Sequence, residues 1–211
     1  MVGNAVLQAA LGDSEVGRVT ALVRRPVKIS HPKLDIIIRD NFLDYKDLRS
    51  LFARQDACLW CLGVSQTRVK SEEEYRTITH DFAVNAANAM LEANPDISFV
   101  FVSGAGADSK EQSRTLFARI KGKTENSLAR LPFKPGKLYL LRPAAITPGP
   151  EGNPNGPWLE RMLYPLHPFF RFFLPKYFIK VTDLARAILR IAKQGTPKQL
   201  LENKDLLDLR S

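Results

Sequence analysis

Two adjacent arginines, Arg24 and Arg25, directly follow the apolar run RVTALV at 18–23. The composition of this run is typical of a buried strand, so both guanidinium groups are expected at the carboxyl end of the strand. A planar guanidinium can hold a phosphate through two hydrogen bonds at once. The pair therefore indicates either a phosphate-binding position or two solvated charges.

A serine and a lysine form the second set of reactive side chains. Ser103 ends the apolar run DISFVFV, and the glycines that follow it also allow a plain turn. Phe117 lies fourteen residues beyond Ser103, and Lys121 follows it by four residues on the same expected helix. Their side chains therefore share one helix face.

The two cysteines, Cys58 and Cys61, lie in the strand-like run ACLWCLG. Side chains alternate along a strand, so an offset of three residues places the thiols on opposite faces. We expect core packing there, and the sequence predicts no metal site. Because two cysteines imply no disulfide framework, a cytoplasmic location is expected, with peripheral attachment to an intracellular membrane as the alternative.

The positioning elements are apolar strands that alternate with amphipathic helices along the 211 residues. The expected strands lie at 18–23, 34–40, 57–63, 96–106 and 137–143. A first helix is expected from near Met1 to Gly12, and the later ones lie at 44–54, 71–95, 113–131 and 183–194, with Asp44 and Ser71 as N-caps. The loop 147–157 is rich in proline and glycine, and a short tail ends the chain.

This alternation predicts an α/β fold with a doubly wound parallel sheet and helices on both faces. We expect a single domain over 1–211, with 147–182 forming a small lid. Ligands of such sheets bind beyond the carboxyl ends of the strands. Besides the residues above, the side chains expected at that edge are Asp40, Leu62, Gly63 and Pro143.

Six stretches, in this order and spacing, resemble the short-chain dehydrogenase/reductase superfamily, and within it the atypical, NmrA-like branch around the Tat-interacting oxidoreductase-like proteins. They are LVRRP, CLG, VSGAGAD, FARIKGKTE, LLRPAAITPGP and VTDLARAIL. The resemblance covers nearly the whole chain. It implies an NAD(P)-binding Rossmann fold and an oxidoreductase that acts on an unknown small-molecule substrate.

The resemblance also implies roles for single residues. In that family a serine holds the substrate oxygen, a tyrosine exchanges the proton, and a lysine binds the nicotinamide ribose. Ser103 and Lys121 match by position, but Phe117 stands where the tyrosine is expected. A phenyl ring has no ionisable group, so the usual general acid/base is missing. The alternative is a non-catalytic regulatory module that senses the cofactor or binds a protein partner.

The cofactor implied by the resemblance is NADP(H) rather than NAD, because arginine after this strand accommodates the 2′-phosphate. By the same resemblance Asp40 contacts the adenine, and Leu62 and Gly63 pass the adenine ribose. Pro143 lies beside the nicotinamide, and Gly3 matches the last glycine of the pyrophosphate-binding turn.

The position of Gly3 carries an expectation about the sheet. In the resembled family, the first and central strand and two further glycines precede this glycine. We therefore expect a sheet that lacks its first central strand, and a sequence that is an incomplete form. The coding DNA upstream of Met1 tests this expectation.

The net charge of +9 is spread along the chain without a run of five like charges or a nucleic-acid motif, so no specific nucleic-acid partner is predicted. The aromatic and basic stretch 158–179 is expected to pack as a lid, with peripheral contact to a membrane as the alternative. No apolar run reaches the roughly 18 residues of a membrane-spanning helix.

Overall fold

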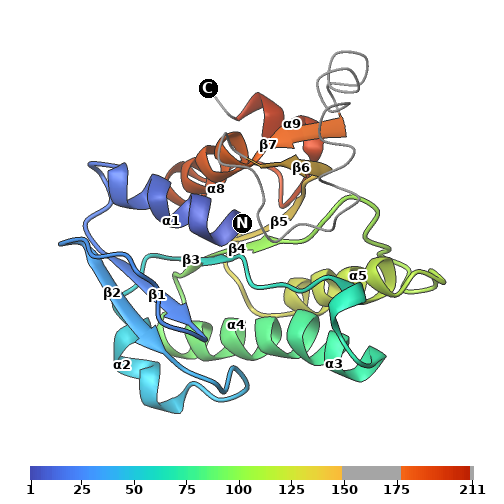
Figure 1. Cartoon of the computed structure of the whole chain (residues 1–211), viewed down its shortest axis with the longest axis horizontal. Coiled ribbons are helices and arrows are strands. Elements are labelled where there is room, and N and C mark those ends of the chain that lie inside the picture. The colour runs from blue at the N-terminus through green and yellow to red at the C-terminus, as the bar shows by residue number, and fades with distance from the viewer. Residues whose placement is uncertain (149–176, 210–211) are drawn as a thin grey trace.

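A computed structural model describes residues 1–148 and 177–209, and its elements form three layers (Figure 1). Most of the strands lie in the middle layer, while β6 and β7 lie near α8 and α9. Above them in the figure lie α1 (Val2–Gly12), α8 (Val181–Gln194) and α9 (Asn203–Asp208). Below them lie α2 (Arg49–Phe52), α3 (Glu72–Arg76), α4 (Phe82–Ala93) and α5 (Leu116–Ala129). The doubly wound α/β arrangement predicted from the sequence is therefore confirmed.

All strand pairs of the described chain are parallel. The larger sheet has the order β3 (Ala57–Trp60), β4 (Ser98–Val102), β5 (Leu138–Arg142) and β8 (Leu200–Glu202). A second sheet pairs β1 (Val19–Val23) with β2 (Leu34–Ile38), and a third pairs β6 (Ala145–Thr147) with β7 (Phe178–Lys180). Because the strands run in parallel, their carboxyl ends meet at one edge.

The division between the two main sheets falls between β1 and β3. Within the described residues, β1 pairs only with β2, and β3 pairs only with β4. This is the position at which the sequence predicts that a central strand is lacking. The buried hydroxyl of Thr20 on β1 and the indole N–H of Trp60 on β3 have no hydrogen-bond partner in the described structure.

Two hydrophobic cores cover the two faces of the larger sheet. One is built from β3, β4, α2 and α4 and contains Phe52, Phe99 and Phe101. The other is built from β5, α1 and α8. Cys58 packs against the first core and Cys61 against the second, which confirms that the two thiols lie on opposite faces. Burial raises the pKa of the Cys61 thiol to about 12, so both cysteines fit the packing role.

The long helix expected at 71–95 is formed by three consecutive helical segments. Ser71 caps its start by accepting a hydrogen bond from the Glu74 backbone N–H at 3.1 Å, as predicted. A π-helical turn over Thr77–Asp81 interrupts it before α4 begins, which the hydrophobic pattern does not reveal. Such a turn is a single-turn bulge inside an α-helix.

Three other expectations need correction. The helix expected at 44–54 is a 3₁₀ turn, Lys46–Leu48, followed by the four-residue α2. Asp44 is not its N-cap, because its carboxylate accepts from the Lys46 backbone N–H within a tight turn. The tail contains β8 and α9, whose strand is too short for its pattern to be recognised. Residues 149–176, which make up most of the lid expected at 147–182 and of the 158–179 stretch, lie outside the described residues, so both expectations stay predictions.

Candidate functional site

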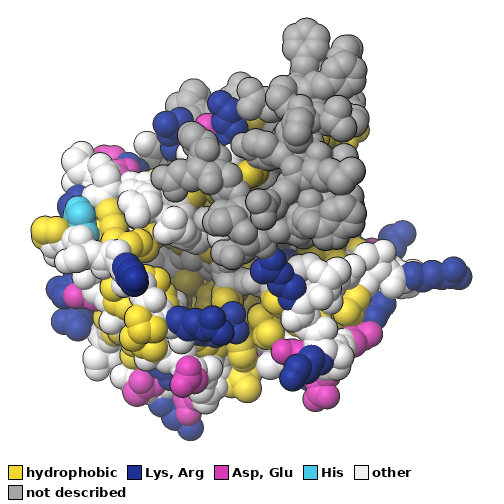
Figure 2. Space-filling view, viewed as in Figure 1, with side chains coloured by type: hydrophobic (Ala, Val, Ile, Leu, Met, Phe, Trp, Pro, Cys, Tyr) yellow, Lys and Arg dark blue, Asp and Glu magenta, His cyan; other side chains and the backbone are white. Residues whose placement is uncertain are grey.

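The candidate site residues come from the carboxyl ends of five strands that all point to one edge. Ser103 follows β4, Arg24 and Arg25 follow β1, and Pro143 follows β5. Asp40 lies two residues beyond β2, and Leu62 and Gly63 lie just beyond β3. Figure 2 shows hydrophobic side chains gathered in a hollow in the middle of one face, with Lys and Arg side chains next to it.

The arginine pair after β1 is exposed, and within the described chain neither guanidinium has a hydrogen-bond or ion-pair partner. Arg39, after β2, differs: its guanidinium donates to both carboxylate oxygens of Asp47 at 3.1 Å and to the Asp44 carbonyl at 2.7 Å. The intramolecular contacts of Arg39 therefore explain its position. Arg24 and Arg25 have no such contacts within the described chain, so both guanidinium groups remain available to an anion.

Gly3 lies in the first turn of α1, beside the end of β3. A Cβ built on Gly3 would lie 3.5 Å from the Cβ of Cys61, which is ordinary van der Waals contact. The fold of the described residues therefore does not itself require glycine at this position. Gly3 is nevertheless close to Leu62 and Gly63, because Cys61 directly precedes them.

Ser103 is buried and bonded to a carboxylate that the sequence interpretation did not single out. Its hydroxyl donates to Oε1 of Glu125, on α5, at 2.5 Å. Both oxygens of Glu125 also accept from Arg142, the last residue of β5: Oε1 from Nε at 3.0 Å and Oε2 from Nη2 at 2.5 Å. Arg142 donates further to Glu202 at the end of β8, so one guanidinium joins the ends of β5 and β8 to α5.

Lys121 lies one turn before Glu125 on the same helix and is also buried, at 7% exposure. Its Nζ donates to the carbonyl of Val102 at 3.0 Å and lies 4.7 Å above the centre of the Phe101 ring. Burial lowers the pKa of this ammonium to about 8, although the Glu125 carboxylate partly opposes the shift. An ammonium has three N–H donors, and among the described residues one carbonyl accepts from it.

Phe117 meets the turn after Ser103. A Cβ on Gly104 would lie 2.7 Å from Cζ of Phe117, closer than to either Cε atom, so the tip of the ring points at Gly104. The Phe117 backbone N–H donates to Oε1 of Gln66 at 3.1 Å. Gln66 lies in the segment that follows β3, and this bond ties that segment to the start of α5.

The structure thus brings together Ser103, Phe117 and Lys121, as their spacing predicts. The sequence places Arg142 at a strand end without a role, and it does not single out Glu125 or Gln66. Glu125 continues the four-residue spacing of Phe117 and Lys121 on one helix face, which is a signal the sequence contains. No such signal exists for Gln66, because its partner is 51 positions away.

The described residues contain neither a candidate metal cluster nor a candidate membrane-spanning helix. No cluster of three or more histidine, cysteine, aspartate or glutamate side chains that could hold a metal ion occurs there. Within residues 1–148 and 177–209, none of the helices is both long and apolar enough to cross a bilayer.

Comparison with protein families gives a match between residues 1–155 and a family described as NAD(P)H-binding. Among curated relatives, "Protein FMP52, mitochondrial" of Eremothecium gossypii is 25% identical over 217 residues, covering 99% of this chain and 92% of that protein. The "Leucinostatins biosynthesis cluster protein T" of Purpureocillium lilacinum is 28% identical over 186 residues, covering 76% of this chain and 66% of that protein.

Solved structures share the fold at low sequence identity. A short-chain dehydrogenase/reductase family oxidoreductase from Burkholderia thailandensis gives a TM-score of 0.65 at 15% identity, covering 98% of this chain and 88% of that one. The human epimerase family protein SDR39U1, solved with NADPH, gives 0.63 at 18% identity, covering 96% and 70%.

The names of the relatives overturn one expectation. Four of them are named as mitochondrial proteins, which contradicts the cytoplasmic location expected from the sequence. The expectation was wrong because it depended on cysteine usage. A low cysteine count argues against a disulfide-rich secreted protein, but it does not distinguish one compartment inside the cell from another.

Proposed function

The chain belongs to the NAD(P)H-binding family, and from that premise we propose that it binds NADP(H) at the carboxyl edge of its sheet and acts as an atypical oxidoreductase on a small molecule. Arg24 and Arg25 would hold the 2′-phosphate, and Lys121 the nicotinamide ribose. The cofactor, when bound, would supply or accept the hydride. The protein contributes the hydroxyl of Ser103 and the buried amine of Lys121.

The observation that carries this proposal is the arginine pair, whose guanidinium groups have no hydrogen-bond or ion-pair partner among residues 1–148 and 177–209. Both guanidinium groups follow the strand after which a 2′-phosphate is recognised in dinucleotide-binding folds. Two exposed cations side by side repel each other and gain free energy when a phosphate lies between them. The free arginines therefore favour NADP(H) over NAD(H), which carries no phosphate at this position.

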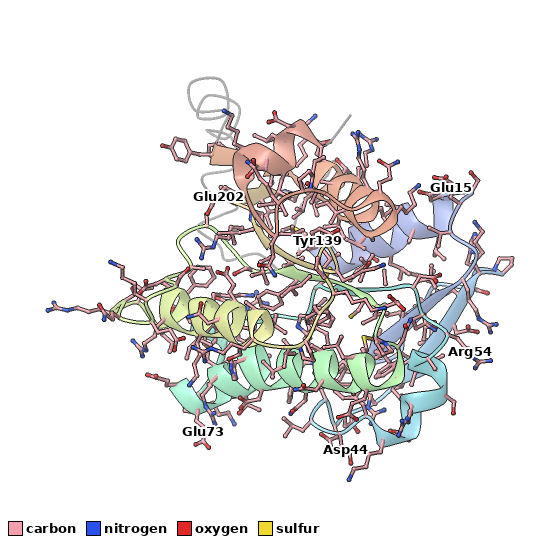
Figure 3. The ribbon with its side chains drawn as sticks, turned by 180° about the vertical axis from the view of Figure 1, so that it is seen from behind. Glu15, Asp44, Arg54, Glu73, Tyr139 and Glu202 are labelled. Carbon is pink, nitrogen blue, oxygen red and sulfur yellow. The ribbon has the colours of Figure 1, made fainter. Side chains whose placement is uncertain are left out.

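Fluorescence titration with NADPH and NADH tests the preference. We expect NADPH to bind more tightly, and Arg24→Ala with Arg25→Ala to weaken NADPH at least tenfold while changing NADH little. Arg54→Ala is the matched control, because Arg54 is exposed and precedes the amino end of β3, and Figure 3 shows it on the side of the view opposite Glu202, which ends β8. Equal affinities for NADPH and NADH would refute the NADP(H) proposal.

A second candidate function is a regulatory module that binds the cofactor without turning over a substrate. Phe117 favours it, because no described group at this position can exchange a proton with a ligand. Transfer of deuterium from [4-²H]NADPH to a panel of aldehydes and ketones distinguishes the two. Transfer above the protein-free rate supports the oxidoreductase, and tight NADPH binding without transfer supports the module.

We also propose a mitochondrial location, on the strength of the names of the relatives. Detection of the native protein in purified mitochondria, resistant to added protease until the membranes are dissolved, tests it. Recovery mainly in another fraction would count against it.

A further inference from the structure

The hydrogen bond between Ser103 and Glu125 fixes what Ser103 can offer to a ligand. The two oxygens are 2.5 Å apart, and both side chains are buried, Glu125 with 4% of its side chain exposed. A hydroxyl has one proton to donate and two lone pairs to accept with. The direction of this one hydrogen bond therefore decides whether the Ser103 hydroxyl donates to a ligand or accepts from it.

Arg142 determines that direction. Its guanidinium meets both oxygens of Glu125, at 3.0 Å and 2.5 Å, and its own side chain is only 12% exposed. The two side chains form a buried salt bridge in which the carboxylate accepts from the guanidinium through both oxygens. An ionised carboxylate can only accept. The proton of Ser103 must therefore point at Glu125.

We propose that Ser103 meets its ligand only as a hydrogen-bond acceptor, and that the ligand group placed there is an O–H or N–H donor, an alcohol in preference to a carbonyl. Glu125 is the positioning residue that fixes this polarity. No described residue donates to the Ser103 oxygen, so its lone pairs are free. This inference rests on the proposed function only in taking the carboxyl edge as the ligand site.

Lys121 supplies the complementary half of the recognition. Its Nζ donates to the carbonyl of Val102, the residue directly before Ser103, and so lies beside the same turn. An ammonium offers only donors, whereas Ser103 offers only an acceptor. A hydroxyl is both donor and acceptor, so one ligand hydroxyl can satisfy both side chains. A carbonyl oxygen can satisfy Lys121 alone.

Glu125 is not assigned the role of a base. Both of its oxygens accept hydrogen bonds from Arg142, and Oε1 also accepts from the Ser103 hydroxyl. The hydrogen bond to Glu125 raises the pKa of the Arg142 guanidinium. The geometry thus supports holding the serine proton in place rather than moving it.

Infrared difference spectroscopy on the full chain tests the bond without any ligand. At neutral pH, the spectrum of the native protein minus that of Glu125→Gln should show the loss of a carboxylate band. Loss of a protonated carboxyl band instead would overturn the proposal. Glu202→Gln is the matched control, because Glu202 contacts the same arginine at 3.2 Å but not Ser103. It should lose a carboxylate band and keep the Ser103 contact.

The preference for an alcohol over a carbonyl is tested by comparing the affinities of cyclohexanol and cyclohexanone for protein loaded with redox-inactive tetrahydro-NADP. We expect the alcohol to bind about fivefold more tightly, the range of one hydrogen bond. Ser103→Ala should abolish the preference. Glu125→Gln should remove or reverse it, since the amide can donate to Ser103 and release its proton. A preference for the ketone, or none in the native protein, overturns the proposal. Failure of NADPH to bind would instead overturn the proposed function.

Discussion

Gly122 on α5 lies directly against the backbone of Asp108, and a Cβ on Gly122 would come within 1.8 Å of the Asp108 carbonyl oxygen. The Asp108 backbone N–H also donates to the Ala118 carbonyl of α5, at 2.9 Å. The segment after β4 is thereby held on the helix that carries Lys121 and Glu125. A side chain at Gly122 would separate the two.

Gly122→Ala is therefore expected to destabilise the protein severely. The methyl group overlaps backbone, which cannot move aside as a side chain can, and the unfolding free energy should fall by about 3 kcal/mol or more. Urea denaturation measures the loss. Gly17→Ala is the control, because a Cβ on Gly17 meets nothing within 4 Å. Equal stability of the two variants would show that the close contact does not exist.

Phe117→Tyr is expected to give no gain in reductase activity, although it restores the residue of the resembled family. The ring tip points at Gly104, so a hydroxyl on Cζ would press on that backbone instead of facing a ligand. Overpacking of this kind lowers the unfolding free energy by about 1–3 kcal/mol. NADPH oxidation with a panel of carbonyl compounds measures the activity, and thermal unfolding measures the stability. A marked rise in turnover would contradict the ring placement.

Arg142→Met should destabilise the protein by about 3–5 kcal/mol, because it leaves the buried Glu125 carboxylate without its partner. The double variant Arg142→Met with Glu125→Met should recover much of that loss, since an apolar pair avoids the unpaired charge. A double-mutant cycle by urea denaturation gives the coupling. Losses that simply add would show that the two side chains do not interact.

Lys121 should make stability depend on pH in the alkaline range. Its pKa in the folded protein is about 8, against an ordinary 10.5, so the unfolded chain binds more protons between these values. The unfolding free energy of the native protein should therefore rise, relative to Lys121→Met, as the pH increases from about 8 to 10.5. Paired urea denaturations across that window measure the difference. A difference that stays constant or falls would place the amine in water.

The sequence predicts the layers of this fold well because continuous apolar strands and amphipathic helices are local patterns. It also places Ser103 and Lys121, whose positions depend on a strand end and a helix face. It misses the π-helical turn, which the hydrophobic pattern does not reveal, and β8, whose three residues are too few for a recognisable pattern. The contact between Glu125 and Arg142 is missed for another reason: it joins a helix to a strand end 17 positions away, and only packing reveals it.

The divided sheet has a consequence for motion. Backbone hydrogen bonds run within β1–β2 and within β3–β4–β5–β8, and none described crosses from β1 to β3. Every residue of β1 is only half-buried, whereas most of β4 and β5 is fully buried. Amide protons of Val19–Val23 should therefore exchange with deuterium much sooner than those of Ser98–Val102. We therefore expect the arginine pair after β1 to belong to a unit that opens more readily than the rest of the fold, and we expect anion binding there to slow its exchange.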